Sequence, residues 1–270
     1  MREARRVVNG GERRGRGVGR SAWLTAIARK IAIASVHAVG ASTPTSSVLL
    51  IAMAAATAPT WDSAAGVWVG ERAAGNVEVP DPLWIFGYGS LCWRPDFKHE
   101  ETMIGRVHGW GRYFAQSSCD HRGTPAAPGL VATLLSDAAL EALGLRDADA
   151  APSSTCGLCY RVGAADAQEV LDNLDFREKG GYTREIIEVT PSSGGAVVKA
   201  LLYSATPENP NFSAAALKDL PGAAKTIATA VGPSGPNIDY LKNLAAWLEK
   251  VEEDDAHVKA LMALLPASGE

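Results

Sequence analysis

A chain of 270 residues with 47% hydrophobic residues is long enough for one sizeable core and an additional segment. Its net charge of −4 gives no overall reason to expect a nucleic-acid partner. Four cysteines in a chain of this length do not make a disulfide framework, which excludes the class of small disulfide-stapled domains.

Residues 1–60 differ in composition from the rest of the chain. They carry nine Lys and Arg and two Asp and Glu, followed by a stretch rich in Ala, Ser and Thr. This composition is typical of an organellar transit segment, and a disordered extension or an over-long gene model starting at Met53 is the alternative. The apolar runs Ala22–Ala28 and Val48–Ala56 are too short to span a bilayer, so no membrane partner is expected.

The remainder of the chain has the charge balance of a cytosolic-type domain. Residues 61–270 hold 17 Lys and Arg against 28 Asp and Glu. A cytoplasmic location is therefore expected, and an organellar one if residues 1–60 are a transit segment. Glycines and prolines scattered through residues 61–82 indicate a linker, so the predicted organisation is 1–60 extension, 61–82 linker and 83–265 folded domain.

The folded part begins near Leu83 and is rich in strands before it becomes helical. Alternating or continuous apolar runs predict strands at Leu83–Phe86, Gly129–Leu135, Thr155–Val162, Arg184–Val189 and Ala196–Ser204. Helical spacing of apolar residues predicts helices from Asp166 to about Lys179, at Ile238–Val251 and at Asp254–Leu265. Asp166 and Glu169 fit a capping box at the start of the first helix. The pattern favours an α+β fold with a mixed or barrel-like sheet.

The stretch "LWIFGYGSLCW", residues 83–93, places two glycines around a tyrosine at the end of a strand. A dinucleotide fingerprint needs a third glycine where Cys92 stands, and a nucleophile elbow needs glycines two residues either side of Ser90, so neither fits. A structural turn and an anion-binding turn remain. Glycine backbones let successive N–H groups converge on one carboxylate, and Ser90 would add a hydroxyl donor.

Glu178 is the candidate acid or base. On a helix that reaches Lys179 it follows Leu171 and Leu174 on the apolar face. Burial and the negative end of the helix would both raise its pKa toward the range that proton transfer near neutral pH requires. The alternative is an ordinary ion pair with Arg177, Lys179 or Arg184, which spacing alone slightly favours.

Cys156 and Cys159 form a C-x-x-C, which raises a metal or redox site as a rival. Residues three apart on a strand point to opposite faces, and the chain has no second C-x-x-C. We therefore expect no metal. His121, beside Cys119 and Asp120, is expected to be a structural or pocket residue.

Taken together, several stretches resemble the ChaC family of glutathione-specific gamma-glutamylcyclotransferases over roughly residues 83–265. They are "LWIFGYGSLCWRPDF" (83–97), "DHRG" (120–123), "LDFREKGGY" (174–182), "NPNF" (209–212) and "GPSGPNIDYL" (232–241). The resemblance implies a small mixed β-barrel with flanking helices. It also implies that the α-amine of a gamma-glutamyl substrate attacks its own side-chain amide, releasing 5-oxoproline and, from glutathione, cysteinylglycine.

That reaction needs no enzyme nucleophile, cofactor or metal. The resemblance assigns Glu178 as the catalytic general acid and base. The predicted substrate-binding residues are Tyr88, Gly89, Ser90, Leu91 and Tyr182, with Asp120 and Arg122 as further pocket residues by resemblance alone. Glutathione is the expected small-molecule partner, and the sequence does not indicate an oligomeric state.

Two positions depart from the family pattern. Ala115 stands where an aromatic residue is expected, and Leu130 stands where an arginine is common. Both were expected in the outer wall of the pocket, and their change predicts a high KM for glutathione and rejection of its disulfide. The alternatives are a cyclotransferase for other gamma-glutamyl amino acids, or a binding module that has lost most turnover.

Overall fold

The structure, a computed structural model, describes residues 60–62, 67–69, 77–178 and 182–266. The chain divides into two compact units, Met1–Met53 and Ala54–Glu270, and all the described residues belong to the second. Residues 1–59 of the predicted extension lie outside the described residues, and only Thr60 is described. Among the helices that the structure describes, none has the length and apolar character to cross a bilayer.

Five strands close into a barrel in the order β3-β7-β4-β8-β9. Their bounds are β3 Leu83–Gly87, β4 Glu101–His108, β7 Ser154–Val162, β8 Thr183–Pro191 and β9 Val198–Ser204. All neighbours are antiparallel except β3 and β9, which pair in parallel through Ile85 and Leu201. The predicted fold class, an α+β fold with a small mixed barrel and flanking helices, is confirmed.

Beside the barrel, β5 (Trp110–Ser118) and β6 (Gly129–Ser136) form a separate antiparallel ribbon. The register shifts by one residue between Phe114 and Gln116, which leaves Ala115 as a bulge. Short pairs complete the strands: β1 (Thr60–Asp62) with β2 (Val67–Val69), inside the segment predicted as a linker, and β10 (Val231–Gly232) with β11 (Gly235–Pro236).

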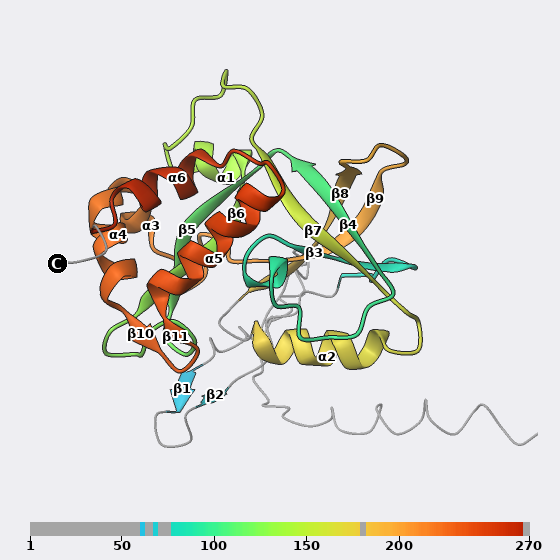
Figure 1. Cartoon of the computed structure of the whole chain (residues 1–270), viewed down its shortest axis with the longest axis horizontal. Coiled ribbons are helices and arrows are strands. Elements are labelled where there is room, and N and C mark those ends of the chain that lie inside the picture. Colours follow the sequence, from blue (N-terminus) through green and yellow to red (C-terminus); the bar gives the residue numbers. More distant parts are fainter. Residues whose placement is uncertain (1–59, 63–66, 70–76, 179–181, 267–270) are drawn as a thin grey trace, which may run out of the picture. The chain divides into compact units, whose positions relative to one another are not determined.

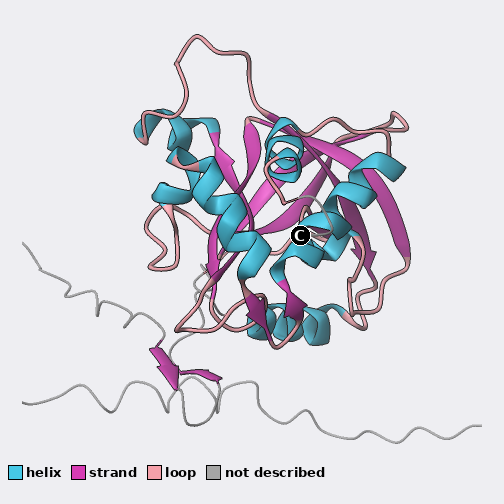
Figure 2. Cartoon of the chain, turned by 60° about the vertical axis from the view of Figure 1, so that its left-hand side comes forward, coloured by secondary structure: helices cyan, strands magenta, loops and turns pink. Residues whose placement is uncertain are grey.

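The helices lie on two sides of this framework (Figure 1). Helix α2 (Ala167–Arg177) packs Val170, Leu171 and Leu174 against the barrel. The helices α3 to α6 gather beside the β5–β6 ribbon, and Figure 2 shows the same grouping from another side. The bounds of the remaining helices are α1 Asp137–Ala142, α3 Ala214–Lys218, α4 Leu220–Thr229, α5 Asn237–Lys250 and α6 Ala256–Ala263, with a 3-10 turn at Ser90–Cys92.

Helix α2 starts as predicted but is capped differently. Asp166 occupies the N-cap position without a side-chain hydrogen bond to the helix. Its carboxylate instead contacts Lys98 Nζ at 3.1 Å, so the predicted capping box with Glu169 is wrong. The helix also ends at Arg177, two residues earlier than the predicted Lys179, and this places Glu178 at the C-cap.

Polar contacts join the start of α6 to β5. Asp255 caps α6 by accepting from Val258 N–H at 3.0 Å, and its other oxygen lies 2.9 Å from the buried guanidinium of Arg112. His257 Nε2 accepts the N–H of Phe114 at 3.0 Å, next to the bulge. An acceptor nitrogen must be unprotonated, and burial lowers the pKa of His257 to about 4, against the opposing effect of Asp255.

This contact predicts an acid-sensitive fold. In the unfolded chain the His257 imidazole titrates near pH 6.5, so its contribution to stability is complete above that pH and is lost as pH falls through about 4. Urea unfolding at pH 7 and pH 4.5 measures the loss. His257→Gln retains an acceptor but does not titrate. Between pH 7 and pH 4.5 the free energy of unfolding of wild type should therefore fall by roughly 2 kcal/mol more than that of the variant. Equal losses would show that His257 has no part in the acid sensitivity.

Candidate active site

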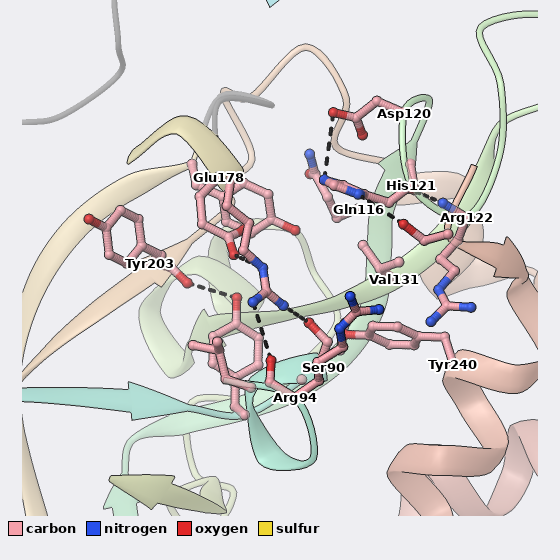
Figure 3. Close-up of a pocket in the computed structure, with 18 of the residues that line it drawn as sticks. Ser90, Arg94, Gln116, Asp120, His121, Arg122, Val131, Glu178, Tyr203 and Tyr240 are labelled. Atoms are coloured by element: carbon pink, nitrogen blue, oxygen red, sulfur yellow. Dashed lines mark hydrogen bonds and ion pairs between the residues drawn. The ribbon is translucent and has the colours of Figure 1, made fainter. Parts of the chain in front are cut away.

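A cavity of about 250 Å³ opens between the end of the barrel, the β5–β6 ribbon and α5. Its lining comes from the end of β3 and the turn after it, the end of β5 with the loop that follows, β6, the C-terminus of α2, β9 and α5, together with the loop residues Tyr182, Asn211 and Ser234. Figure 3 shows the labelled members converging on this space: Ser90, Arg94, Gln116, Asp120, His121, Arg122, Val131, Glu178, Tyr203 and Tyr240. The residues predicted from the sequence also line it, namely Glu178, Tyr88, Gly89, Ser90, Leu91 and Tyr182, and so do Asp120 and Arg122, the two added by resemblance.

The turn after β3 presents backbone donors to the cavity. It passes into a 3-10 turn in which Cys92 N–H bonds Gly89 O at 2.9 Å and Arg94 N–H bonds Ser90 O at 2.8 Å. Within the part of the chain that the structure describes, the N–H groups of Gly89, Ser90 and Leu91 donate to no acceptor. The first N–H groups of a helical turn have no hydrogen-bond partner within the turn.

The reason for glycine at position 89 is different from the one expected. Gly89 has φ −124°, so the turn does not need a positive φ there. A Cβ on Gly89 would instead overlap the hydroxyl of Tyr240, which reaches across from α5. Gly87 is similarly restricted, because a Cβ there would lie 2.6 Å from that of Leu91. Close packing restricts both glycines, and at Gly89 the ψ of −129° also lies outside the backbone regions that L residues favour.

Glu178 projects into the cavity from the C-cap of α2. Its N–H closes the helix on Leu174 O at 2.8 Å, and its side chain is 19% exposed. Burial raises the pKa of Glu178, and Asp120 adds to this, while Arg177 and His121 act in the opposite direction. The result is a carboxylate that holds a proton more readily than an exposed glutamate does.

Arg177 connects Glu178 to the turn. Its Nε lies 3.4 Å from Glu178 Oε1, and its Nη2 donates to Ser90 Oγ. The ion pair considered as an alternative to catalysis thus exists, but it is part of the cavity wall. Of the other two cations considered, Arg184 pairs with Asp175, and Lys179 lies outside the described residues.

Tyrosine hydroxyls surround the carboxylate. Tyr88 donates to Tyr203 O at 2.8 Å. Burial raises the pKa of Tyr88, Tyr182 and Tyr240 well above its usual value, and the nearby charge of Glu178 adds to this for all three. These phenols are therefore neutral near pH 7 and can act as hydrogen-bond donors.

The "DHRG" loop brings three polar side chains to the opposite side of the cavity. Asp120 Oδ2 lies 3.8 Å from His121 Nε2, and His121 Nδ1 lies 3.3 Å from Ser234 Oγ. Arg122 lies over the ring of Tyr240, with its Cζ 5.8 Å from the centroid. The sequence indicates Arg177 only as an ion-pair partner of Glu178 and does not indicate Tyr240 as a pocket residue, although both belong to quoted motifs. Their roles depend on contacts between distant segments, which spacing does not show.

Ala115 and Leu130 were expected in the outer wall, and this expectation is wrong. Ala115 is the fully buried bulge of β5, and its carbonyl accepts from Ser213 N–H at 2.7 Å. Leu130 packs in the core and its backbone bonds the side chain of Asn237. Neither residue lines the cavity. The high KM expected from their substitution therefore has no structural basis.

Cys156 and Cys159 pack in the core. Burial raises the pKa of Cys156 to about 11 and that of Cys159 to about 12, so both thiols are protonated near pH 7. No group of three or more His, Cys, Asp or Glu side chains is placed to hold a metal ion within the described residues.

The fold and the cavity define a small-molecule site at the end of a mixed five-stranded barrel, with the partly buried carboxylate of Glu178 beside backbone donors. The sequence profile of the ChaC-like protein family matches residues 83–267. The chain belongs to this family.

Relatives with assigned names agree with this membership. The chain is 36% identical over 188 residues to human "Glutathione-specific gamma-glutamylcyclotransferase 1", covering 68% of this chain and 78% of the relative. It is 37% identical over 187 residues to "Gamma-glutamylcyclotransferase 2-3" of Arabidopsis thaliana, covering 66% and 86%. A solved yeast structure, described as a gamma-glutamyl cyclotransferase specific to glutathione, superposes with a TM-score of 0.61 at 31% identity, covering 68% and 95%.

Proposed function

We propose that this chain is a glutathione-specific gamma-glutamylcyclotransferase, which releases 5-oxoproline and cysteinylglycine. Its family and the names of its relatives support the activity. The observation that carries the chemistry is Glu178, a carboxylate with a raised pKa that faces the cavity beside the Tyr88–Leu91 turn.

The proposed reaction uses the substrate's own nucleophile. Glu178 accepts a proton from the α-ammonium, and the amine nitrogen attacks the side-chain amide carbon to close a five-membered ring. When the carbon–nitrogen bond to cysteine breaks, Glu178 returns the proton to the departing amine. The ring nitrogen then loses its second proton, again through Glu178, to that amine, which leaves as an ammonium. No proton is gained or lost overall, and Glu178 is ready for another turnover. A raised pKa suits both directions of this transfer.

The turn supplies orientation. The N–H groups of Gly89, Ser90 and Leu91 would receive the α-carboxylate or the developing oxyanion, and Tyr182 adds a neutral donor close to Glu178. Folding the glutamyl chain back on itself in this way can contribute on the order of 7–11 kcal/mol toward the barrier. In this mechanism Tyr88, through its bond to Tyr203 O, holds the turn against β9.

Incubation of the purified chain with glutathione tests the proposal. Equal amounts of 5-oxoproline and cysteinylglycine should appear, without added metal or cofactor. Turnover of gamma-glutamylalanine in preference to glutathione would support the alternative of a broader gamma-glutamyl amino acid cyclotransferase. Tight glutathione binding with no product would support the alternative of a binding module.

The proposed domain organisation keeps residues 1–60 as an extension, 61–82 as a linker and 83–265 as the catalytic domain. The family match begins at residue 83, which supports the third boundary. Deletion of residues 1–60 should leave kcat/KM and Tm nearly unchanged, because every residue lining the cavity lies after residue 85. A drop in Tm of several degrees would show that the extension stabilises the domain.

We propose a cytoplasmic location, with an organelle as the alternative if residues 1–60 direct import. Fusion of these residues to a fluorescent protein tests this. Diffuse fluorescence supports the cytoplasm, and fluorescence confined to an organelle supports a transit segment.

A further inference from the structure

Three arginines line the cavity, and two of them have a carboxylate partner. Arg94 Nε lies 2.8 Å from Asp96, and Arg177 lies beside Glu178. Arg122 has no acidic partner within ion-pair distance among the described residues. A partly buried guanidinium without a counter-charge is a site that an anionic ligand group can fill.

The Arg122 side chain is held in place without using up its donors. Its Nη1 donates to Pro236 O at 3.1 Å, and the guanidinium lies over the ring of Tyr240. A guanidinium carries five N–H donors in a fixed fork, so this single bond leaves donors for a ligand in the cavity that Arg122 lines. Burial lowers the pKa of Arg122, Tyr240 and Asp239 act in the opposite direction, and the charge of Arg94 lowers it slightly further. A bound carboxylate would offset the cost of burying this charge.

Arg122 also lies away from the reacting end of the cavity. Figure 3 shows Glu178 on one side and Arg122 on the other, with Gln116 and Val131 between them. Tyr240 connects the two regions, because its hydroxyl abuts Gly89 and its ring faces Arg122. A substrate whose glutamyl head meets the Tyr88–Leu91 turn would therefore extend its other end toward Arg122.

Glutathione has a second carboxylate at that other end. The cysteinylglycine portion adds two residues, a reach of about 7 Å when extended. We propose that Arg122 binds the glycine carboxylate of glutathione and thereby determines preference for the tripeptide. This inference rests on the proposed function. The arginine that is common at position 130 in the family cannot be the partner of this carboxylate here, because position 130 holds Leu130, which packs in the core.

The test compares glutathione with its C-terminal amide, which differs only by the missing charge. Wild type should prefer glutathione by about 10- to 100-fold in kcat/KM. Arg122→Gln should lose this preference, mainly through KM, while turnover of the amide stays within about twofold of wild type. Arg122→Lys should recover part of the preference. Arg94→Gln is the matched control, since its guanidinium is exposed and already paired, and it should retain most of the preference.

Each outcome decides the assignment. Equal loss on both substrates would show that Arg122 supports the cavity wall and does not select the ligand. An unchanged preference in Arg122→Gln would place the glycine carboxylate elsewhere. If wild type forms 5-oxoproline but does not distinguish the two substrates, the Arg122 assignment alone fails. If wild type forms no 5-oxoproline from either, the proposed function fails and the assignment fails with it.

Discussion

Glu178→Gln should reduce 5-oxoproline formation by about 100- to 10,000-fold, the usual range for loss of a general acid or base. Glutamine is close in size and keeps hydrogen-bonding capacity, but it cannot accept the ammonium proton. The C-cap bond to Leu174 is made by the backbone, so the fold should persist. Steady-state kinetics measure turnover, and calorimetry measures glutathione binding, which should remain.

The matched control is Glu188→Gln on β8, where the side chain is exposed and outside the cavity. It should behave like wild type. In wild type the acidic limb of the kcat/KM profile should lie above pH 4.5, because the raised pKa of Glu178 leaves it protonated at higher pH than an ordinary glutamate. Near-normal turnover in Glu178→Gln would remove this residue as the base.

Gly89→Val should lower kcat/KM by about 100-fold, because a misplacement of roughly 1 Å at a reacting centre has effects of that size. The valine Cβ would overlap the Tyr240 hydroxyl, and its methyl groups would enter the cavity where the glutamyl head is proposed to bind. Kinetics with glutathione measure the loss. An unchanged KM would mean that the turn is only structural.

A second pair of variants separates steric from conformational causes. Gly89→Ala should also be impaired, and Tyr240→Phe should restore part of its activity by removing the overlapping hydroxyl. The ψ of −129° at Gly89 is unfavourable for alanine in either background, so removal of the hydroxyl should relieve only the overlap, and the expected rescue is partial. If the double variant is no better than Gly89→Ala, the overlap is not the cause of the defect.

The strands with apolar runs could be predicted from the sequence. The elements that were missed, such as β4 and α4, contain a glycine, charged residues or a proline that interrupt the expected pattern. β4 contains Gly105 and several charged residues, yet it lies between β7 and β8 in the barrel. Gly105 is required there because a Cβ would lie 2.5 Å from Val189 Cγ1. Helix α4 was missed because Pro221 usually ends a helix. Here Pro221 lies in the first turn, where proline is tolerated, and Asp219 caps the helix.

The site residues that lie within one short sequence motif could be predicted. Glu178 and the Tyr88–Leu91 turn were identified from local stretches, and the structure brings them together around one cavity. The wall was not predictable, because it depends on register. The bulge after Phe114 turns Ala115 into the core and leaves Gln116 facing the cavity. Likewise, only the packing of α5 shows that Tyr240 joins Gly89 to Arg122.

The most direct test of the central claim is the source of oxygen in the product. In water enriched with oxygen-18, attack by the substrate's own amine retains the amide oxygen, so 5-oxoproline should carry no label and no glutamate should form. Formation of labelled glutamate would show that water attacks the amide, and would contradict the proposed roles of Glu178 and the Tyr88–Leu91 turn.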